Sequence, residues 1–374
     1  MIPYGRQSID QSDIDAVVEV LKSDFITTGP KIAEFEQAVC AFTGAKFAVA
    51  VSSGTAALHC AMFAAGIKPG DEVIVTPMTF AASSNAILYC GGTPVFADVI
   101  PGTLLIDPAQ VARKITGNTK AVVAVDYAGQ PCDYDALKDI CSKHGLVLIS
   151  DACHSMGGGY KGRKVGTLAD MTVLSFHPVK HITTGEGGMI LTDNADFAGK
   201  MRMFRGHGIT TDYRQREEKG SWFYEMVDLG YNYRITDFQC ALGISQLKKL
   251  PGWIERRQQI AEEYDSAFKS NSSIVPISKS PEVSHAYHLY VVRIEKAGRN
   301  NIFTRLRNAG IGVNVHYIPV HLHPYYRNKL GTGEGLCPVA EEAYGHIISL
   351  PIFPGIGDKD IKHIVETIKQ EVEL

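Results

Sequence analysis

Short apolar runs alternate with helical segments along the first half of this chain. Runs rich in aliphatic and β-branched residues, as in buried strands, lie at 46–51, 72–76, 94–98, 120–125, 146–150 and 170–176. Expected helices separate these runs. One begins at 52, and others cover 81–90, 107–114 and 133–144. Repeated strand–helix units join parallel strands. The pattern therefore predicts an α/β fold whose mostly parallel central sheet is flanked by helices.

The second half of the chain predicts a smaller domain. At 374 residues the chain is longer than a single hydrophobic core normally organises. A long helix is expected at 236–268, with the domain boundary at Pro251-Gly252 inside it, so we expect a large domain at 1–250 and a small α+β domain at 251–374. Strand-like runs at 289–294 and 312–315 alternate there with helices near 301–309 and 359–371.

Polar residues stand where two of the expected strands end. Asp151 follows the strand at 146–150, while Ser175 and then Lys180, after a turn at Pro178, follow the strand at 170–176. Open α/β sheets bind ligands at the carboxyl ends of their strands. Taken singly, Asp151 could be a helix cap and Lys180 a solvated surface charge. Together they predict a ligand site at this edge.

The same stretch carries a family resemblance. Asp151-x-x-His154, Ser175-Phe-His-x-x-Lys180 and the Thr-Gly-Glu-Gly-Gly run at 184–188 resemble the DegT/StrS group of sugar aminotransferases, which depend on pyridoxal 5'-phosphate. The resemblance extends over nearly the whole chain. It implies the fold type I architecture of aspartate aminotransferase-like enzymes, with pyridoxal phosphate as the cofactor.

The resemblance also assigns roles to these residues. Asp151 contacts the pyridine nitrogen, Lys180 bonds to the cofactor's aldehyde carbon and Ser175 contacts the phosphate; Asp151 and Lys180 are the expected catalytic pair. His154 lies beside the cofactor, either on its ring oxygen or as a packing residue. The chemistry fits these types, because a carboxylate keeps the ring nitrogen protonated and a lysine that loses its proton can attack and shuttle protons.

Two more segments are expected to hold the cofactor. A strand, a glycine turn and a helix start at 46–58 offer free N–H groups to a phosphate, so Gly54, Thr55 and Ala56 are the expected cradle. A capped helix after any strand would look similar. Phe80 stacks on the pyridine ring by resemblance, and its alternative is a core position.

The substrate residues are implied by resemblance alone. They are Tyr4, Asp24, Phe25, Ile26, Thr27, His316, Tyr317, Ile318 and Pro319. Without the resemblance, 24–30 would be interpreted as an ordinary Gly-Pro turn. Three histidines at 316, 321 and 323 suggest a metal site, but no carboxylate lies within that run, so we expect none and assign His321 and His323 structural roles.

The implied reaction moves an amino group from glutamate to the C4 ketone of a UDP-linked 4-keto-6-deoxy-N-acetylhexosamine. Two alternatives stay open: an aminotransferase for another nucleotide-linked keto sugar, of the legionaminic, bacillosamine or perosamine type, and a non-catalytic member of the fold. Lys180 argues against the family's dehydratases, which carry histidine there. The resemblance further implies a homodimer with shared active sites, to which the loop 230–234 brings Asn232 from the neighbouring subunit; a plain surface turn is the alternative.

The composition limits the classes of binding partner that we expect. A formal net charge of −3 without a basic run argues against nucleic acid or an acidic membrane surface as the main partner. The N-terminus lacks a signal pattern and no apolar run approaches a membrane span, so we expect a cytoplasmic protein. The eight cysteines form no CxxC pair and predict reduced thiols.

Residues 8–23 place Ile14, Val17, Val18 and Leu21 on one face of an amphipathic helix.

Overall fold

The computed structural model describes residues 1–211, 213–218, 220–295 and 298–373. Its helices are α1 (Gln11–Leu21), α2 (Pro30–Thr43), α3 (Gly54–Ala64), α4 (Ala82–Tyr89), α5 (Pro108–Lys114), α6 (Tyr134–His144), α7 (Ala195–Phe204), α8 (Tyr213–Glu218), α9 (Asp237–Phe268), α10 (Arg299–Asn308), α11 (Pro324–Leu330), α12 (Pro338–His346) and α13 (Asp358–Glu373). Its strands are β1 (Phe47–Val51), β2 (Glu72–Val75), β3 (Thr93–Phe96), β4 (Thr119–Val125), β5 (Val147–Asp151), β6 (Gly159–Tyr160), β7 (Arg163–Lys164), β8 (Met171–Ser175), β9 (Gly188–Thr192), β10 (Ile274–Pro276), β11 (Val283–Ser284), β12 (Tyr290–Ile294) and β13 (Ile347–Leu350).

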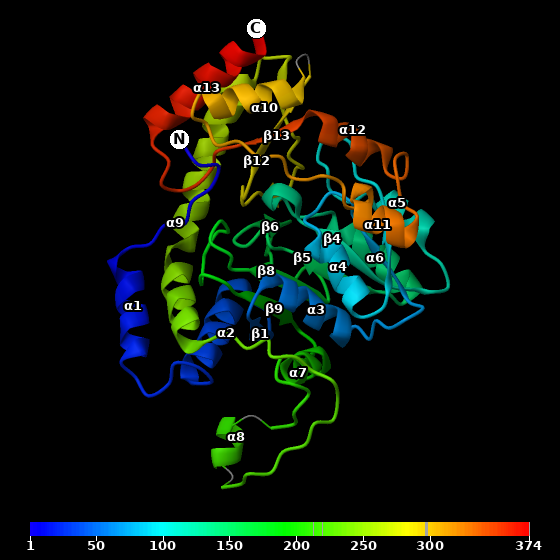
Figure 1. Ribbon diagram of the computed structural model, residues 1–374, viewed down its shortest axis with the longest axis vertical. Coiled ribbons are helices and arrows are strands. Elements are labelled where there is room, and N and C mark those ends of the chain that lie inside the picture. The colour runs from blue at the N-terminus through cyan, green and yellow to red at the C-terminus, as the bar shows by residue number, and fades with distance from the viewer. Residues whose placement is uncertain (212, 219, 296–297, 374) are drawn as a thin grey trace.

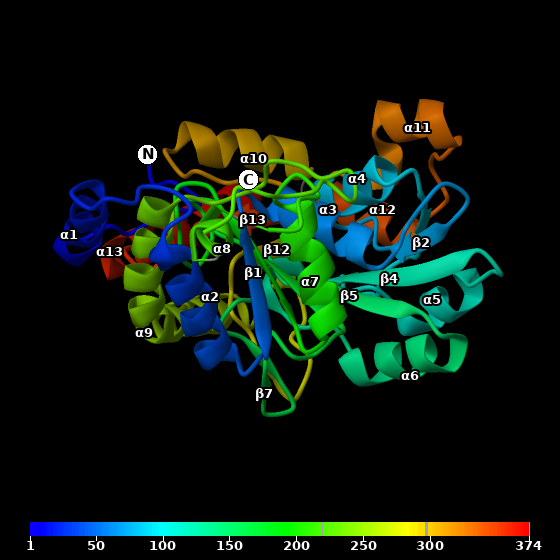
Figure 2. The ribbon, with the colours of Figure 1, turned by 90° about the horizontal axis from the view of Figure 1, so that it is seen from below.

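A seven-stranded sheet forms the centre of the large domain, in the order β1-β9-β8-β5-β4-β2-β3. The pairs β8–β5, β5–β4, β4–β2 and β2–β3 are parallel, whereas β9 runs antiparallel to both β1 and β8. Helices α3 and α4 cover one face and α5 and α6 the other (Figure 2). The mostly parallel, helix-flanked sheet predicted from the alternating pattern is confirmed. Buried aliphatic strands with no polar face require this double cover.

A second core lies at the other end of α9. The antiparallel sheet β10-β12-β13 packs with α10, α13 and the last turns of α9 into a separate hydrophobic cluster (Figure 1). Part of the chain after residue 250, including Val320, Tyr326 and Ala340, instead packs in the first cluster. Helix α9 runs through Pro251 without a break. The division at 250/251 therefore stays a prediction.

Two expectations differ from the structure. Residues 312–315 do not form a strand, because Asn314 makes only an isolated bridge to Ser349. Helix α1 forms, but much of its expected apolar stripe faces outward: Ile14 is 48% and Leu21 is 56% exposed. The helix packs on α9 through Asp13 and Val20 on an adjacent side.

The structure also describes the cysteines and the apolar character of the helices. All eight cysteines are free thiols. Within the described residues, no helix is both long and apolar enough to cross a membrane.

Candidate active site

Asp151 ends β5 at the carboxyl edge of the parallel strands, as predicted. Its side chain is buried, and its Oδ2 accepts a hydrogen bond from Ser83 Oγ of α4 at 2.7 Å. The backbone N–H of Cys153 lies 3.3 Å from the other carboxylate oxygen. These two donors fix the orientation of the carboxylate. Ser83 was not identified from the sequence, because a serine inside a helix gives no functional signal.

Lys180 lies on the turn that follows β8 and approaches the same edge. Lys180 is partly buried, and this burial lowers the pKa of its amine, while the negative charge of Asp151 opposes the shift. A lysine with a lowered pKa holds more free amine at neutral pH than a surface lysine does. Lys180 Nζ lies 3.3 Å from Nε2 of His288, a contact that the sequence did not predict.

The first turn of α3 lies directly against Ser175. A Cβ added to Gly54 would come within 2.9 Å of the Ser175 Cβ, so only glycine leaves room there. Ser53 caps the helix by accepting from the Ala56 N–H at 3.0 Å, which leaves the N–H groups of Gly54 and Thr55 as the unpaired donors of the first turn. Gly54 and Thr55 thus have N–H groups that could serve a phosphate and Ala56 does not, and the role of the three residues as a phosphate cradle stays a prediction.

Aromatic and histidine side chains line the space beside Asp151 and Lys180. The Phe80 ring is 62% exposed, unlike a core residue, and lies 6.2 Å from the Tyr317 ring. Tyr317 Oη lies 3.1 Å from His154 Nε2, and the Tyr4 and His316 rings lie 5.4 Å apart. Ile318, next to Pro319 in the same segment, is 42% exposed. Five of the predicted residues are thus linked by a chain of ring contacts and one hydrogen bond: Phe80, Tyr317, His154, His316 and Tyr4.

Two predicted groups lie elsewhere in the single chain. The segment 24–27 contacts the start of α9, where Thr27 bridges to Thr236 and the Ile26 carbonyl accepts from the Asp237 N–H at 3.0 Å. Asn232 bridges to Gly206. Within the described residues neither group contacts Lys180, although Tyr233, next to Asn232, accepts a hydrogen bond from the Ser52 N–H at 2.8 Å, two residues before Gly54. Phe25 and Ile26 are 43% and 52% exposed.

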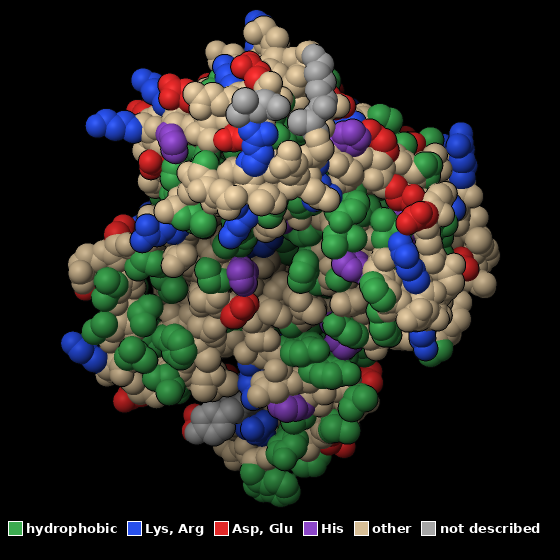
Figure 3. All heavy atoms as spheres, turned by 45° about the horizontal axis from the view of Figure 1, so that its top comes forward, with side chains coloured by type: hydrophobic (Ala, Val, Ile, Leu, Met, Phe, Trp, Pro, Cys, Tyr) green, Lys and Arg blue, Asp and Glu red, His purple; other side chains and the backbone are tan. Residues whose placement is uncertain are grey.

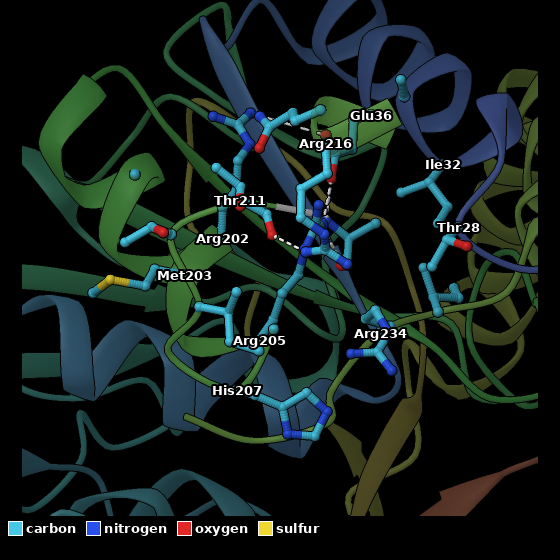
Figure 4. Close-up of a pocket in the computed structure, with 18 of the residues that line it drawn as sticks. Thr28, Ile32, Glu36, Arg202, Met203, Arg205, His207, Thr211, Arg216 and Arg234 are labelled. Atoms are coloured by element: carbon cyan, nitrogen blue, oxygen red, sulfur yellow. Dashed lines mark hydrogen bonds and ion pairs between the residues drawn. The ribbon is translucent and has the colours of Figure 1, made fainter. Parts of the chain in front are cut away.

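A cavity near these two groups does not have Lys180 in its lining. It has a volume of about 690 Å³, and its lining includes Thr28, Glu36, Arg205 and Arg234 (Figure 4). Arg205 Nη1 lies 2.6 Å from the Glu36 carboxylate, which compensates that arginine's charge. The cavity is therefore not the site that Asp151, Ser175 and Lys180 define.

The three histidines of the segment 316–323 do not converge. His316 Nδ1 lies 2.8 Å from Ser349 Oγ, and His321 Nε2 lies 2.8 Å from the Glu341 carboxylate. Across the described ranges, no group of three histidine, cysteine or carboxylate side chains is placed to hold a metal ion.

Comparison with known proteins defines the class. The DegT/DnrJ/EryC1/StrS aminotransferase family model matches residues 7–369. The chain is 41% identical to the spore coat polysaccharide biosynthesis protein SpsC of Bacillus subtilis, covering 100% of this chain and 97% of that protein. It is 38% identical to the UDP-4-amino-4,6-dideoxy-N-acetyl-beta-L-altrosamine transaminase of Campylobacter jejuni, covering 98% and 96%.

Two solved structures are similar throughout. One is the PMP form of the putative sugar aminotransferase Spr1654 from Streptococcus pneumoniae, with a TM-score of 0.95, 35% identity and coverage of 100% and 99%. The other is Helicobacter pylori PseC, an aminotransferase involved in the biosynthesis of pseudoaminic acid, with a TM-score of 0.93, 33% identity and coverage of 100% and 99%. The fold is therefore that of the fold type I pyridoxal-phosphate enzymes.

The chain belongs to the DegT/DnrJ/EryC1/StrS aminotransferase family. It is an aminotransferase, and its cofactor is pyridoxal phosphate. The residues present fit that group: Gly54 leaves a cradle that a Cβ would fill, Asp151 offers a fixed carboxylate, and buried His154 Nδ1 has no hydrogen-bond partner among the described residues.

Proposed function

We propose that this chain transfers an amino group, with glutamate as the donor, to C4 of a UDP-linked 4-keto-6-deoxy-N-acetylhexosamine. The product is UDP-4-amino-4,6-dideoxy-N-acetyl-β-L-altrosamine, an intermediate of pseudaminic acid biosynthesis. The observation that carries the proposal is the full-length similarity to the C. jejuni transaminase and to H. pylori PseC. The site's geometry supports it, since Asp151, Ser175 and Lys180 meet at one edge beside the Gly54 turn.

The roles of the residues follow from their chemistry. Asp151 holds the proton on the cofactor's ring nitrogen, while the Gly54–Thr55 N–H groups and Ser175 hold the phosphate. Pyridoxal phosphate, when bound, supplies an electron sink for the carbon that loses its proton. Lys180 takes that proton on Nζ and returns it to the neighbouring carbon, which balances the transfer. Phe80 covers one face of the ring and excludes water from it.

The substrate side of the site is assigned to two groups of residues. Tyr4 contacts His316 of the segment His316–Pro319. His316 is close enough to Lys180 for the lysine charge to lower its pKa, after the larger effect of burial. The Tyr127 hydroxyl donates to the His316 carbonyl and fixes the segment. A sugar hydroxyl or carbonyl can hydrogen-bond to such phenol and imidazole groups. Residues 24–27 are assigned to the site of a second subunit.

The sugar preference is tested by a substrate panel. We expect kcat/KM to be highest for the UDP-linked 4-keto-6-deoxy-N-acetylhexosamine and about 10²-fold or more lower for a TDP-linked keto hexose without the acetamido group, since polar groups left unpaired in a binding site are costly. Steady-state rates with glutamate as donor measure this. A TDP-linked sugar that gives the highest value would contradict the proposal.

A second candidate rests on the SpsC relative. At 41% identity over the whole chain, that protein is at least as similar as the C. jejuni transaminase, and its name places it in polysaccharide biosynthesis of the spore coat. An aminotransferase for another nucleotide-linked keto sugar would use the same cofactor residues. Further nucleotide-linked keto sugars added to the same panel distinguish the two candidates.

We further propose that the active enzyme is a homodimer with shared sites. The hydrophobic surface supports this: Figure 3 shows such side chains gathered over the α1 flank and at the lower end of the molecule. The segment after α8 carries exposed Trp222 (84%), Met226 (66%) and Leu229 (68%) just before Asn232. Exposed apolar area of this extent is typical of interfaces. A two-fold axis would place 24–27 and Asn232 beside the partner's cofactor, which explains why they lie apart from Lys180.

Mixing inactive variants tests the shared site. Lys180→Ala and Asn232→Ala subunits, once exchanged, form hybrids with one doubly damaged and one intact site. Activity should return to about a quarter of wild type, because half of randomly paired dimers are hybrids and each keeps one of two sites. Subunit exchange is confirmed by native mass spectrometry.

The matched control mixes Lys180→Ala with Asp151→Asn. Both residues lie in one chain's own site, so each hybrid site stays damaged and no activity should return. Recovery in the control, or none in the Asn232 mixture despite confirmed exchange, would show that the assignment of Asn232 to the partner subunit is wrong.

A further inference from the structure

The amine of Lys180 lies against an imidazole from a distant part of the chain. His288 stands just before β12, in the segment that leads into the second sheet, and its side chain is 5% exposed. Its Nε2 lies 3.3 Å from Lys180 Nζ, and its ring lies 4.3 Å from the His154 ring. The proposed function leaves His288 without a role.

The backbone of His288 is held from three sides. Arg257 of α9, itself 2% exposed, donates to the Tyr287 carbonyl at 3.0 Å. The Leu289 N–H donates to the Ala128 carbonyl at 3.1 Å. A Cβ at Gly129 would lie 2.9 Å from the His288 nitrogen, so this position needs glycine for the two segments to meet. The backbone that carries the imidazole is therefore fixed, and the ring packs between those of His154 and His181, at 4.3 and 5.7 Å.

Burial keeps the ring of His288 neutral. It lowers the pKa of His288 well below its ordinary value, and the positive charges of Lys180 and Arg257 act in the same direction. A neutral imidazole can accept a hydrogen bond at Nε2 when Nδ1 carries the ring proton.

We propose that His288 is a positioning residue for the Lys180 amine. Its Nε2 accepts one N–H of the amine, which turns the nitrogen lone pair away from the imidazole. The lone pair then faces the carbon atoms between which Lys180 moves its proton. Nζ gains the proton from one carbon and gives it to the other, while His288 gains and loses none. This role rests on the proposed aminotransferase function.

Two amide variants separate the role from a packing effect. The longer side chain of the His288→Gln variant places its amide near the Nε2 position and keeps an acceptor for Lys180. The shorter side chain of His288→Asn places the amide near Nδ1, which has no partner among the described residues, and leaves Nζ without its acceptor. Both are neutral and polar, and thermal melting shows whether each variant folds.

The first measurement needs no substrate and no cofactor. Acetic anhydride labels free amines, and mass spectrometry against pH reports the pKa of Lys180 in the apoprotein, with exposed Lys120 as the internal reference. A hydrogen bond to the ammonium form stabilises it, so we expect the pKa of Lys180 to fall by about one unit in His288→Asn and to stay near the wild-type value in His288→Gln.

The second measurement is the single-turnover rate of amine transfer from the donor to the cofactor. We expect a loss of about 10-fold or more in His288→Asn and less than about 3-fold in His288→Gln, with the Kd of the cofactor unchanged. A lower pKa together with a slower reaction is the signature of lost positioning, because a lower pKa alone supplies more free amine.

Identical behaviour of the two variants in labelling and rate would overturn the proposal, whether both match wild type or both are damaged. Failure of the sugar assignment would leave the labelling result untouched, since that measurement involves no sugar. The two proposals can therefore fail separately.

Discussion

Replacing Lys180 by alanine should lower amine transfer on the order of 10⁴-fold, because the chain loses both its bond to the cofactor and its proton carrier. The variant should still bind pyridoxal phosphate through the Gly54 turn and Ser175. Borohydride should no longer attach the cofactor covalently to the protein. Turnover assays and mass spectrometry after reduction measure the two effects.

Lys161→Ala is the matched control. Lys161 is exposed, lies 2.8 Å from the Asp135 carboxylate and stands in the turn between β6 and β7, which belong to a separate small sheet. Its removal should leave turnover and the reduced adduct unchanged. If Lys180→Ala turns over like wild type, or if reduction attaches the cofactor to another lysine, the assignment of Lys180 is wrong.

Replacing Asp151 by asparagine should lower turnover by about 10² to 10⁴-fold with a modest loss of cofactor affinity. The asparagine can still accept from Ser83 Oγ, so the shape of the site remains. It cannot hold a proton on the ring nitrogen, however, and the cofactor then withdraws electrons poorly. Single-turnover rates at saturating cofactor measure the chemical step, and fluorescence titration measures cofactor binding.

Asp126→Asn provides the comparison. Asp126 is also buried nearby, and burial raises its pKa to about 6, but it bonds Tyr134 and Ser155 rather than facing the cofactor region. Its substitution should lower the melting temperature more than the rate. An Asp151→Asn rate within a few-fold of wild type would refute the role of Asp151, and an equal rate loss in Asp126→Asn would point to a general disturbance of the site.

Sequence reasoning located Asp151, Ser175 and Lys180 because sheet geometry makes their positions regular. Each follows a buried strand, and the ends of neighbouring parallel strands meet at one edge. Phe80, Tyr4 and His316 were accessible only through family resemblance, since a single aromatic or histidine carries no periodic signal. The structure then brought these residues into one chain of contacts.

His288, Arg257 and Ser83 could not be predicted in this way. His288 stands at the beginning of a strand in the smaller sheet, where the rule for carboxyl ends does not apply. Arg257 lies within a long helix, and a charged residue there normally indicates a solvated face, yet it is 2% exposed. Their relevance depends on how α9 and β12 pack against the central sheet, which no local pattern encodes.

The exposed stripe of α1 shows a related limit. The spacing of Ile14, Val18 and Leu21 correctly indicated a helix with an apolar face, but not which neighbour covers that face. In the single chain the helix turns Asp13 inward, where Gln246 and Lys249 bond it. Periodicity identifies a surface to be buried and leaves open whether the cover comes from the same chain.

Helix α9 imposes a constraint on how the length of this chain can vary. Its first half contributes Leu247 and Leu250 to one core, and its second half contributes Tyr264 and Phe268 to the other. One inserted residue between these pairs would rotate everything beyond it by about 100° about the helix axis. One of the two cores would then face water. Insertions and deletions should therefore be excluded from the middle of α9 across related sequences and accumulate in the surface loops.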